Sequence, residues 1–171
     1  MRTPTPRAFF KSFDACAARV IAGVHAVLAA DDIPGERYQG HLKHDWPVLV
    51  AVGEESRYIG DAIALVAAET KDILKRALAA IKVEYEERTP ILTVDEALAA
   101  DAAKIHPDGN RLVVNAKVLR GDVEEAFAGS AHVVHETFYS PAVEHAFMEP
   151  ETALAHMNDD GILVVYTAGQ S

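Results

Sequence analysis

The chain has 171 residues, half of them hydrophobic and a quarter charged, which favours a packed globular core over a disordered chain. Its formal net charge of −10 argues against a surface for nucleic acid or for an anionic membrane, because both bind through clustered Lys and Arg. The single cysteine, Cys16, rules out an internal disulfide and a thiolate cluster for zinc or iron–sulfur.

The first predicted elements are a strand, a short helix and a second strand. Residues 8–13 are typical of a strand, and Asp14 is expected to cap an Ala-rich helix that ends at Gly23. Residues 24–29 then form the next strand. Because Cys16 lies in the Ala-rich stretch, we expect it to be a small buried hydrophobe.

The clearest pattern lies between Tyr58 and Tyr85. Residues 62–68 are a nearly continuous apolar run, which predicts a strand covered on both faces. Thr70 takes an N-cap position, and the apolar residues after it share one helical face. These residues are Ile73, Leu74, Ala77, Leu78 and Ile81. Residues 83–85 restart a strand, so the pattern predicts a βαβ unit.

Shorter elements are expected around this pattern. The polar segment 31–46 is typical of a loop, and Pro90 breaks the chain. Asp122 and Glu125 have the spacing of a capping-box variant and predict the start of another helix. We further expect a helix at 94–100, a connection at 101–110 and strands at 112–119, 131–139 and 162–167.

The eight histidines suggest a metal site, but their spacing argues against one. His132 and His135 form an HxxHE string within a β-like run, where residues three apart point to opposite faces. The two imidazoles therefore could not chelate one ion. His41 and His44 lie in the polar loop and are expected to be solvated. A small metal-binding protein is accordingly the least favoured alternative.

The segment VEHAFMEPE combines a histidine, three carboxylates, Phe147 and Met148. We expect a turn between strands, with the Phe and Met buried and the charges solvated. A buried carboxylate here could act as a general base, an alternative that the residues alone leave open. The chain has no phosphate-binding glycine loop and no serine nucleophile elbow. The residues alone thus predict a soluble, acidic α+β domain that is truncated.

Three strings, taken in order, cover nearly the whole chain. They are PRAFFKSFDACAARVIAGVHAVLAADDIPG at 6–35, RYIGDAIALVAAETKDILKRALAAIKVEYEE at 57–87, and the stretch 104–157 with its KIHPDGN, GDVEEAF and HAFMEP motifs. Together they resemble the molybdopterin-binding large subunit of the xanthine dehydrogenase/aldehyde oxidoreductase family. Ala62 stands where that family often has proline.

The resemblance implies an α+β fold with two parts. Residues 1–118 would form the α/β hammerhead domain and a linker, with a mixed sheet, few helices and the first strand missing. Residues 119–171 would form the first strands of a truncated molybdenum-cofactor-binding domain. Enzymes of this family hydroxylate a purine, an aldehyde or an N-heterocycle, using oxygen from water. Electrons then pass to iron–sulfur and FAD domains or subunits.

For site residues, the resemblance implies that Gln170 contacts an oxygen ligand of molybdenum. His145 and Glu149 match the family's H-x-x-x-E-P marker, whose role is open. No catalytic residue and no metal ligand is expected. Because later family segments would lie beyond Ser171, we expect the isolated chain to be structural and inactive and to bind no molybdopterin.

The expected partners are the remainder of the molybdenum subunit and the iron–sulfur and FAD parts of the parent oxidoreductase. Unpaired strand edges in the last part of the chain are expected to favour self-association. No nucleic-acid or membrane partner is expected. The start of the chain lacks the apolar core of a signal peptide, which favours the cytoplasm. The alternative is a stand-alone accessory or interaction protein that has the hammerhead fold and no catalysis.

Overall fold

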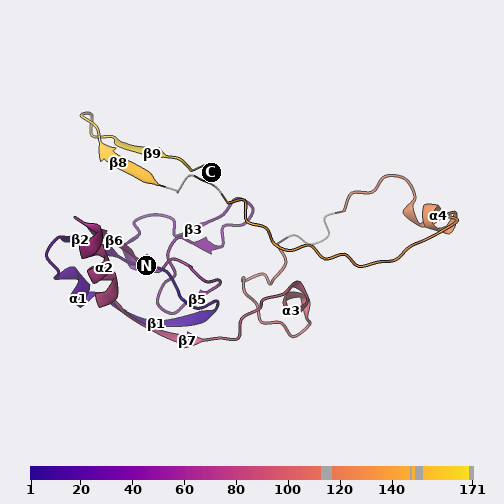
Figure 1. Ribbon diagram of the computed structural model, residues 1–171, viewed down its shortest axis with the longest axis horizontal. Helices are drawn as coiled ribbons and strands as arrows, with labels where there is room; N and C mark the ends of the chain where they lie inside the picture. The colour runs from indigo at the N-terminus through magenta and orange to yellow at the C-terminus, as the bar shows by residue number, and fades with distance from the viewer. Residues whose placement is uncertain (113–116, 147, 149–151, 170–171) are drawn as a thin grey trace. The chain divides into compact units, whose positions relative to one another are not determined.

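The computed structural model describes residues 1–112, 117–146, 148 and 152–169 (Figure 1). The chain divides into two compact units, Met1–Lys117 and Val118–Ser171, and each is described by itself. Among the described residues, no helix has the length and apolar character needed to cross a membrane.

The main sheet of the N-terminal unit has three antiparallel strands. β1 (Ala8–Asp14) lies between the short β5 (Glu55–Ser56) and β7 (Lys82–Glu87). The β1–β7 register shifts between Phe10 and Ser12, so the strand bends there. The side chain of Phe10 is buried. The predicted strand at 8–13 is confirmed.

A second, two-stranded antiparallel sheet pairs β2 (Val24–Leu28) with β6 (Leu65–Ala68). α1 (Cys16–Arg19) contacts β2, and α2 (Lys71–Ala80) contacts α1 and both strands. Small side chains at the contact let the two helices approach closely. The buried cluster here consists of Ala15, Ala18, Val27, Ala77 and Ile81.

The helix α2 begins where the sequence predicts. The Thr70 side-chain Oγ1 accepts a hydrogen bond of 3.2 Å from the backbone N–H of Ile73, which satisfies one of the free donors of the first turn. Ala77 faces the core and is fully buried. Ile81 is extended and leads the chain directly into β7.

The predicted βαβ unit is wrong, although its three elements exist. β6 and β7 lie in different sheets, and each pairs antiparallel with a strand from earlier in the chain. α2 therefore carries the chain from one sheet to the other. The sequence also predicted that the strand at 62–68 is covered on both faces. This cover is incomplete, since Ile63 and Ala64 are fully buried whereas Leu65 is 56% exposed.

Two expectations at α1 are also corrected. Asp14 accepts a hydrogen bond of 2.9 Å from the N–H of Cys16, but the N-cap is Ala15 and the helix ends at Arg19. Cys16 is exposed, not buried. The reason is its place on the helix, because Ala15 and Ala18 occupy the face that meets the core.

The predicted loop at 31–46 is largely irregular. It contains the 3₁₀ turn η1 (Ala30–Asp32) and the short pair β3 (Tyr38–Gln39) and β4 (Trp46–Pro47). Beyond the main sheet, α3 (Val94–Leu98) has a capping box formed by Thr93 with Glu96, so the predicted helix at 94–100 is confirmed except for its last residues.

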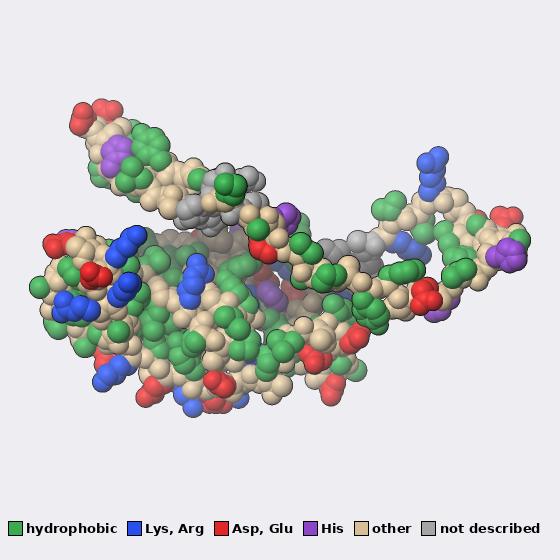
Figure 2. Space-filling view, in the orientation of Figure 1, with side chains coloured by type: hydrophobic (Ala, Val, Ile, Leu, Met, Phe, Trp, Pro, Cys, Tyr) green, Lys and Arg blue, Asp and Glu red, His purple; other side chains and the backbone are tan. Residues whose placement is uncertain are grey.

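The second unit contains one helix and one hairpin in its described part. α4 (Val123–Ala128) starts at Asp122, whose Oδ1 accepts a hydrogen bond of 2.9 Å from the N–H of Glu125, as the capping-box spacing predicts. β8 (Ala153–Met157) and β9 (Leu163–Thr167) form an antiparallel ribbon. β9 confirms the strand predicted at 162–167, whereas β8 was not predicted. Hydrophobic side chains of the hairpin reach the surface (Figure 2).

The predicted strand at 131–139 is wrong, because this segment pairs with no other described segment. A strand needs a neighbour to satisfy its backbone N–H and C=O groups, and apolar alternation alone cannot supply one. Of the strand predicted at 112–119, residues 113–116 lie outside the described residues, and 117–119 are irregular.

Candidate functional site

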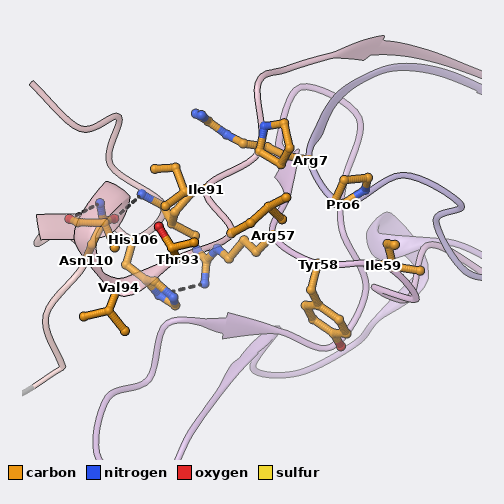
Figure 3. Close-up of a pocket in the computed structure, with 14 residues that line it drawn as sticks. Pro6, Arg7, Arg57, Tyr58, Ile59, Ile91, Thr93, Val94, His106 and Asn110 are labelled. Carbon is orange, nitrogen blue, oxygen red and sulfur yellow. Dashed lines mark hydrogen bonds between the residues drawn. The ribbon is translucent and has the colours of Figure 1, made fainter. Parts of the chain in front are cut away.

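One hollow of the N-terminal unit is a groove of about 590 Å³ (Figure 3). Its walls come from the segment before β1, the turn after β5 and the region around α3. Most of the lining is apolar, including Ile59 and Val94, which are 65% and 73% exposed. The described lining residues include two arginines and one histidine but no carboxylate.

Arg57 and His106 point toward one another within this groove (Figure 3). Nη1 of Arg57 donates to the backbone oxygen of Asp45 and lies 3.2 Å from Nδ1 of His106. The same Nδ1 lies 2.7 Å from the carboxylate Oδ2 of Asp45. A single imidazole nitrogen therefore has two partners of opposite charge.

Arg7, on another wall of the groove, is held by an ion pair. Its Nε and Nη2 donate to one carboxylate oxygen of Glu55 over 2.9 and 2.8 Å, and its Nη1 donates to the backbone oxygen of Thr89 over 3.3 Å. Its positive charge is thus matched by a carboxylate beside it.

Asn110 organises the segment that carries His106. Its side-chain Oδ1 accepts from the N–H of Ile105 over 2.8 Å, and its Nδ2 donates to the backbone oxygens of Ala97 and Ala103. Asparagine can make these bonds together because its amide has both donors and an acceptor. One side chain thus ties the end of α3 to the loop that follows it.

A second polar cluster lies around Glu54. Arg37 and the hydroxyl of Tyr38 donate to its carboxylate, and the backbone N–H of Ala51 donates over 3.0 Å. These hydrogen bonds, led by those from Arg37, lower the pKa of Glu54 to about 2. The hydrogen bond to Glu54 in turn raises the pKa of Tyr38. The cluster therefore keeps the carboxylate of Glu54 ionised, with hydrogen-bond donors directed at its oxygens.

Asp61, in the RYIGD motif, is the most buried carboxylate among the described residues, with 1% of the residue exposed. Burial raises its pKa, although its Oδ2 accepts a hydrogen bond of 3.0 Å from the backbone N–H of Arg57. The backbone oxygen of Asp61 accepts from Thr3. The residue thus fixes the turn that places Arg57 and Tyr58 beside the groove.

This geometry is that of a structural junction. The charged side chains around the groove pair with one another, and each pair holds two neighbouring segments together. Asp45 and Glu54 were not singled out by the sequence, because their side-chain partners His106 and Arg37 lie 61 and 17 residues away. His106 and Asn110 did carry a signal, since they stand in the KIHPDGN motif.

The residues predicted from the sequence lie elsewhere. His145 is exposed in an irregular part of the second unit, and its N–H donates to Glu144 over 3.0 Å. Gln170 and Glu149 lie outside the described residues. His132 and His135 are exposed, and the described residues contain no group of three or more metal-ligating side chains close enough to share an ion.

Two protein-family models match the chain in succession. The model described as aldehyde oxidase and xanthine dehydrogenase, a/b hammerhead domain, matches residues 1–89, just over half of the chain. The chain belongs to this family. The model for the molybdopterin cofactor-binding domain matches residues 105–171. The resemblance stated from the sequence motifs is therefore confirmed, together with the predicted α+β hammerhead fold.

Curated relatives carry matching descriptions. The chain is 39% identical to the nicotinate dehydrogenase large molybdopterin subunit of Eubacterium barkeri, a match that covers 99% of this chain and 39% of the relative. It is also 39% identical to a probable xanthine dehydrogenase subunit of Bacillus subtilis, covering 99% of this chain and 22% of that protein. The chain thus spans well under half the length of these relatives.

Solved structures give the same family. The aldehyde oxidoreductase from Desulfovibrio gigas is 27% identical with a TM-score of 0.79, over 97% of this chain and 19% of that one. Quinoline 2-oxidoreductase from Pseudomonas putida 86 is 26% identical with a TM-score of 0.76, over 99% of this chain and 22% of that one.

Proposed function

We propose that the chain is the hammerhead domain and the first part of the cofactor-binding domain of a molybdenum hydroxylase. The parent enzyme hydroxylates a purine, an aldehyde or an N-heterocycle with oxygen derived from water. The observation that carries the proposal is the succession of the two family matches along one chain, at 1–89 and 105–171. Relatives described as molybdopterin or molybdenum-binding subunits support it.

We place the border between the two domains at residues 118–119. The compact N-terminal unit, which ends at Lys117, supports this border. The partners in the parent would be the rest of the molybdenum subunit and the iron–sulfur and FAD domains or subunits. Several relatives are named as subunits, which supports an assembly of this kind.

The chain's own contribution to this reaction is a scaffold. Molybdopterin would supply the redox chemistry when bound in the parent, and Gln170 would contact an oxygen ligand of the metal. In the second unit the described residues include no buried side chain.

The test begins with the purified chain. Molybdenum analysis and pterin fluorescence are expected to show no stoichiometric cofactor, and a stoichiometric amount would overturn the proposal that the chain alone is inactive. In the assembled parent enzyme, Gln170→Ala should lower the turnover number while molybdenum content stays constant. The matched control is Gln39→Ala, an exposed residue of the first unit. Equal activity of the two variants would remove Gln170 from the site.

One observation also favours an interaction protein without catalysis. Large apolar side chains of the second unit are strongly exposed, among them Phe138 at 88% and Tyr139 at 94%. Such side chains mark a surface that contacts another polypeptide. The reading frame decides between the two functions: continuation past Ser171 into further family motifs supports the hydroxylase, and a stop codon there supports the interaction protein.

A further inference from the structure

The groove described above contains two guanidinium groups that differ in their partners. Arg7 directs both Nε and Nη2 at the carboxylate of Glu55. Arg57 uses only Nη1, which contacts the backbone oxygen of Asp45 and Nδ1 of His106. No described residue accepts a hydrogen bond from its Nε or Nη2, and no described carboxylate forms an ion pair with it. One edge of the Arg57 guanidinium is therefore available to a ligand.

This Nε–Nη2 edge of Arg57 matches a carboxylate. Its N–H groups point in parallel, and their spacing fits the two oxygens of a carboxylate. The neighbouring acids are engaged elsewhere, since Asp61 is buried and accepts from the backbone N–H of Arg57, and the carboxylate of Asp45 contacts His106. Because the contacts of Nη1 hold the guanidinium in place, the edge is already oriented before a ligand binds.

The walls around this edge are apolar and exposed to solvent. Figure 3 shows Arg57 between His106 on one side and Tyr58 on the other. Ile59 and Leu92, which also line the groove, are 65% and 73% exposed. The described lining residues include no acidic side chain, in a chain whose net charge is −10. The groove thus complements a ligand that has a carboxylate next to apolar groups.

The apolar surface continues past the groove into a second hollow. Tyr58 lines both, and in the second hollow, of about 380 Å³, it is joined by Trp46 and Val48. The rings of Trp46 and Tyr58 meet edge to face with their centroids 5.6 Å apart, and Trp46 is 55% exposed. A small molecule is usually buried in one enclosed cavity. Two adjoining hollows with exposed walls are better suited to successive side chains of an extended peptide.

We propose that the groove is a docking site for an extended segment of a partner polypeptide. An Asp or Glu side chain of the partner binds the Nε–Nη2 edge of Arg57, and apolar side chains beside it cover Ile59, Leu92 and Trp46. Both functions proposed above bring another polypeptide to this chain, so the inference does not depend on the molybdenum reaction.

Binding of a capped probe peptide to the full chain tests the proposal. The probe is acetyl-Gly-Leu-Val-Glu-Ile-Pro-Ser-amide, and its matched control has Gln in place of Glu. In NMR titrations at low salt, the backbone N–H signals of residues 57–59 and 91–94 should shift with the Glu peptide. The Gln peptide should bind about five- to tenfold more weakly, because it lacks the charge of a partly exposed, hydrogen-bonded ion pair. Equal affinities of the two peptides would overturn the proposal.

A substitution in the protein tests the guanidinium edge itself. Arg57→Lys keeps the positive charge but loses the parallel N–H groups, so it should weaken binding of the Glu peptide about fivefold and leave the Gln peptide unaffected. Arg76→Lys, the same change at an exposed position of α2, should alter neither affinity. A folded Arg57→Lys chain, checked by circular dichroism, that binds both peptides like wild type contradicts the proposal. The comparison of Glu and Gln peptides on the wild-type chain decides the question if this variant does not fold.

The apolar walls distinguish a peptide from other occupants. Ile59→Ala should weaken binding of the Glu peptide about threefold, whereas Val20→Ala, at 82% exposure and outside the groove, should not. Hexanoate has a carboxylate and an apolar chain but no flanking residues, so it should need at least about tenfold higher concentrations to shift the same signals. Hexanoate that binds as tightly as the peptide would assign the groove to a small acid. Shifts of residues 57–59 on concentrating the chain without peptide would assign it to a second copy, and either result would overturn the proposal.

Discussion

Replacing Glu54 by glutamine is expected to lower the free energy of unfolding by about 2 kcal/mol at pH 7. The pKa of Glu54 falls from 4.5 to about 2, chiefly because Arg37 donates hydrogen bonds to the carboxylate. A difference of this size corresponds to about 3 kcal/mol at most. The side chain is 27% exposed, so solvent reduces the value toward the range of about 1.5–3 kcal/mol for hydrogen bonds to charged groups.

The pH dependence has a defined sign. Because folding lowers the pKa of Glu54, its contribution is complete above about pH 4.5 and is lost as pH falls toward about 2. The difference between wild type and Glu54→Gln should therefore shrink to less than half at pH 3. Urea unfolding followed by circular dichroism measures it, with Glu84→Gln, an exposed residue of β7, as the control. Equal effects of the two substitutions, or a difference for Glu54→Gln that does not change with pH, would refute the reasoning.

Further predictions concern the core, one turn and the hairpin. Ile63→Ala should lower the free energy of unfolding by about 2–4 kcal/mol, since Ile63 is fully buried, while Ile59→Ala, at 65% exposure, should change it by less than about 0.5 kcal/mol. Gly40→Ala should lower the melting temperature strongly, because φ is +149° and the added Cβ would clash with the backbone oxygen of Lys43. At Gly35 an added Cβ would meet open space, so Gly35→Ala should leave the melting temperature unchanged. Light scattering should show self-association of the chain through its exposed hairpin, and a strict monomer at high concentration would count against this.

The parts of the fold that could be predicted depend on residues close together in the chain. Thr70 and Asp122 cap their helices through bonds to residues three positions later, and such spacing is visible in the sequence. The apolar stripe of α2 has the same local character. These signals locate an element, but they do not say which partner it meets.

Strand pairing and the junction around the groove depend on distant residues. The sequence between 62 and 85 is compatible with a βαβ unit, and only the pairing of β1 with β7 and of β2 with β6 excludes one. Asp45 and His106 meet across 61 positions, and nothing in their local sequence relates them. The family resemblance gave the family and the hammerhead fold, because it adds information about partners that periodicity lacks.

The hairpin β8–β9 shows that the burial of a side chain depends on what packs against its segment and not on the segment alone. On one face Ala155 pairs with Val165, flanked by Met157 opposite Leu163. The other face carries the pair of Leu154 with Tyr166, and the Tyr166 ring stacks on His156. A ribbon that is apolar on both faces is marginal by itself, and its pattern is typical of a strand covered on both sides. The described residues of the second unit leave most of these side chains exposed, so we expect the hairpin to pack against a further surface.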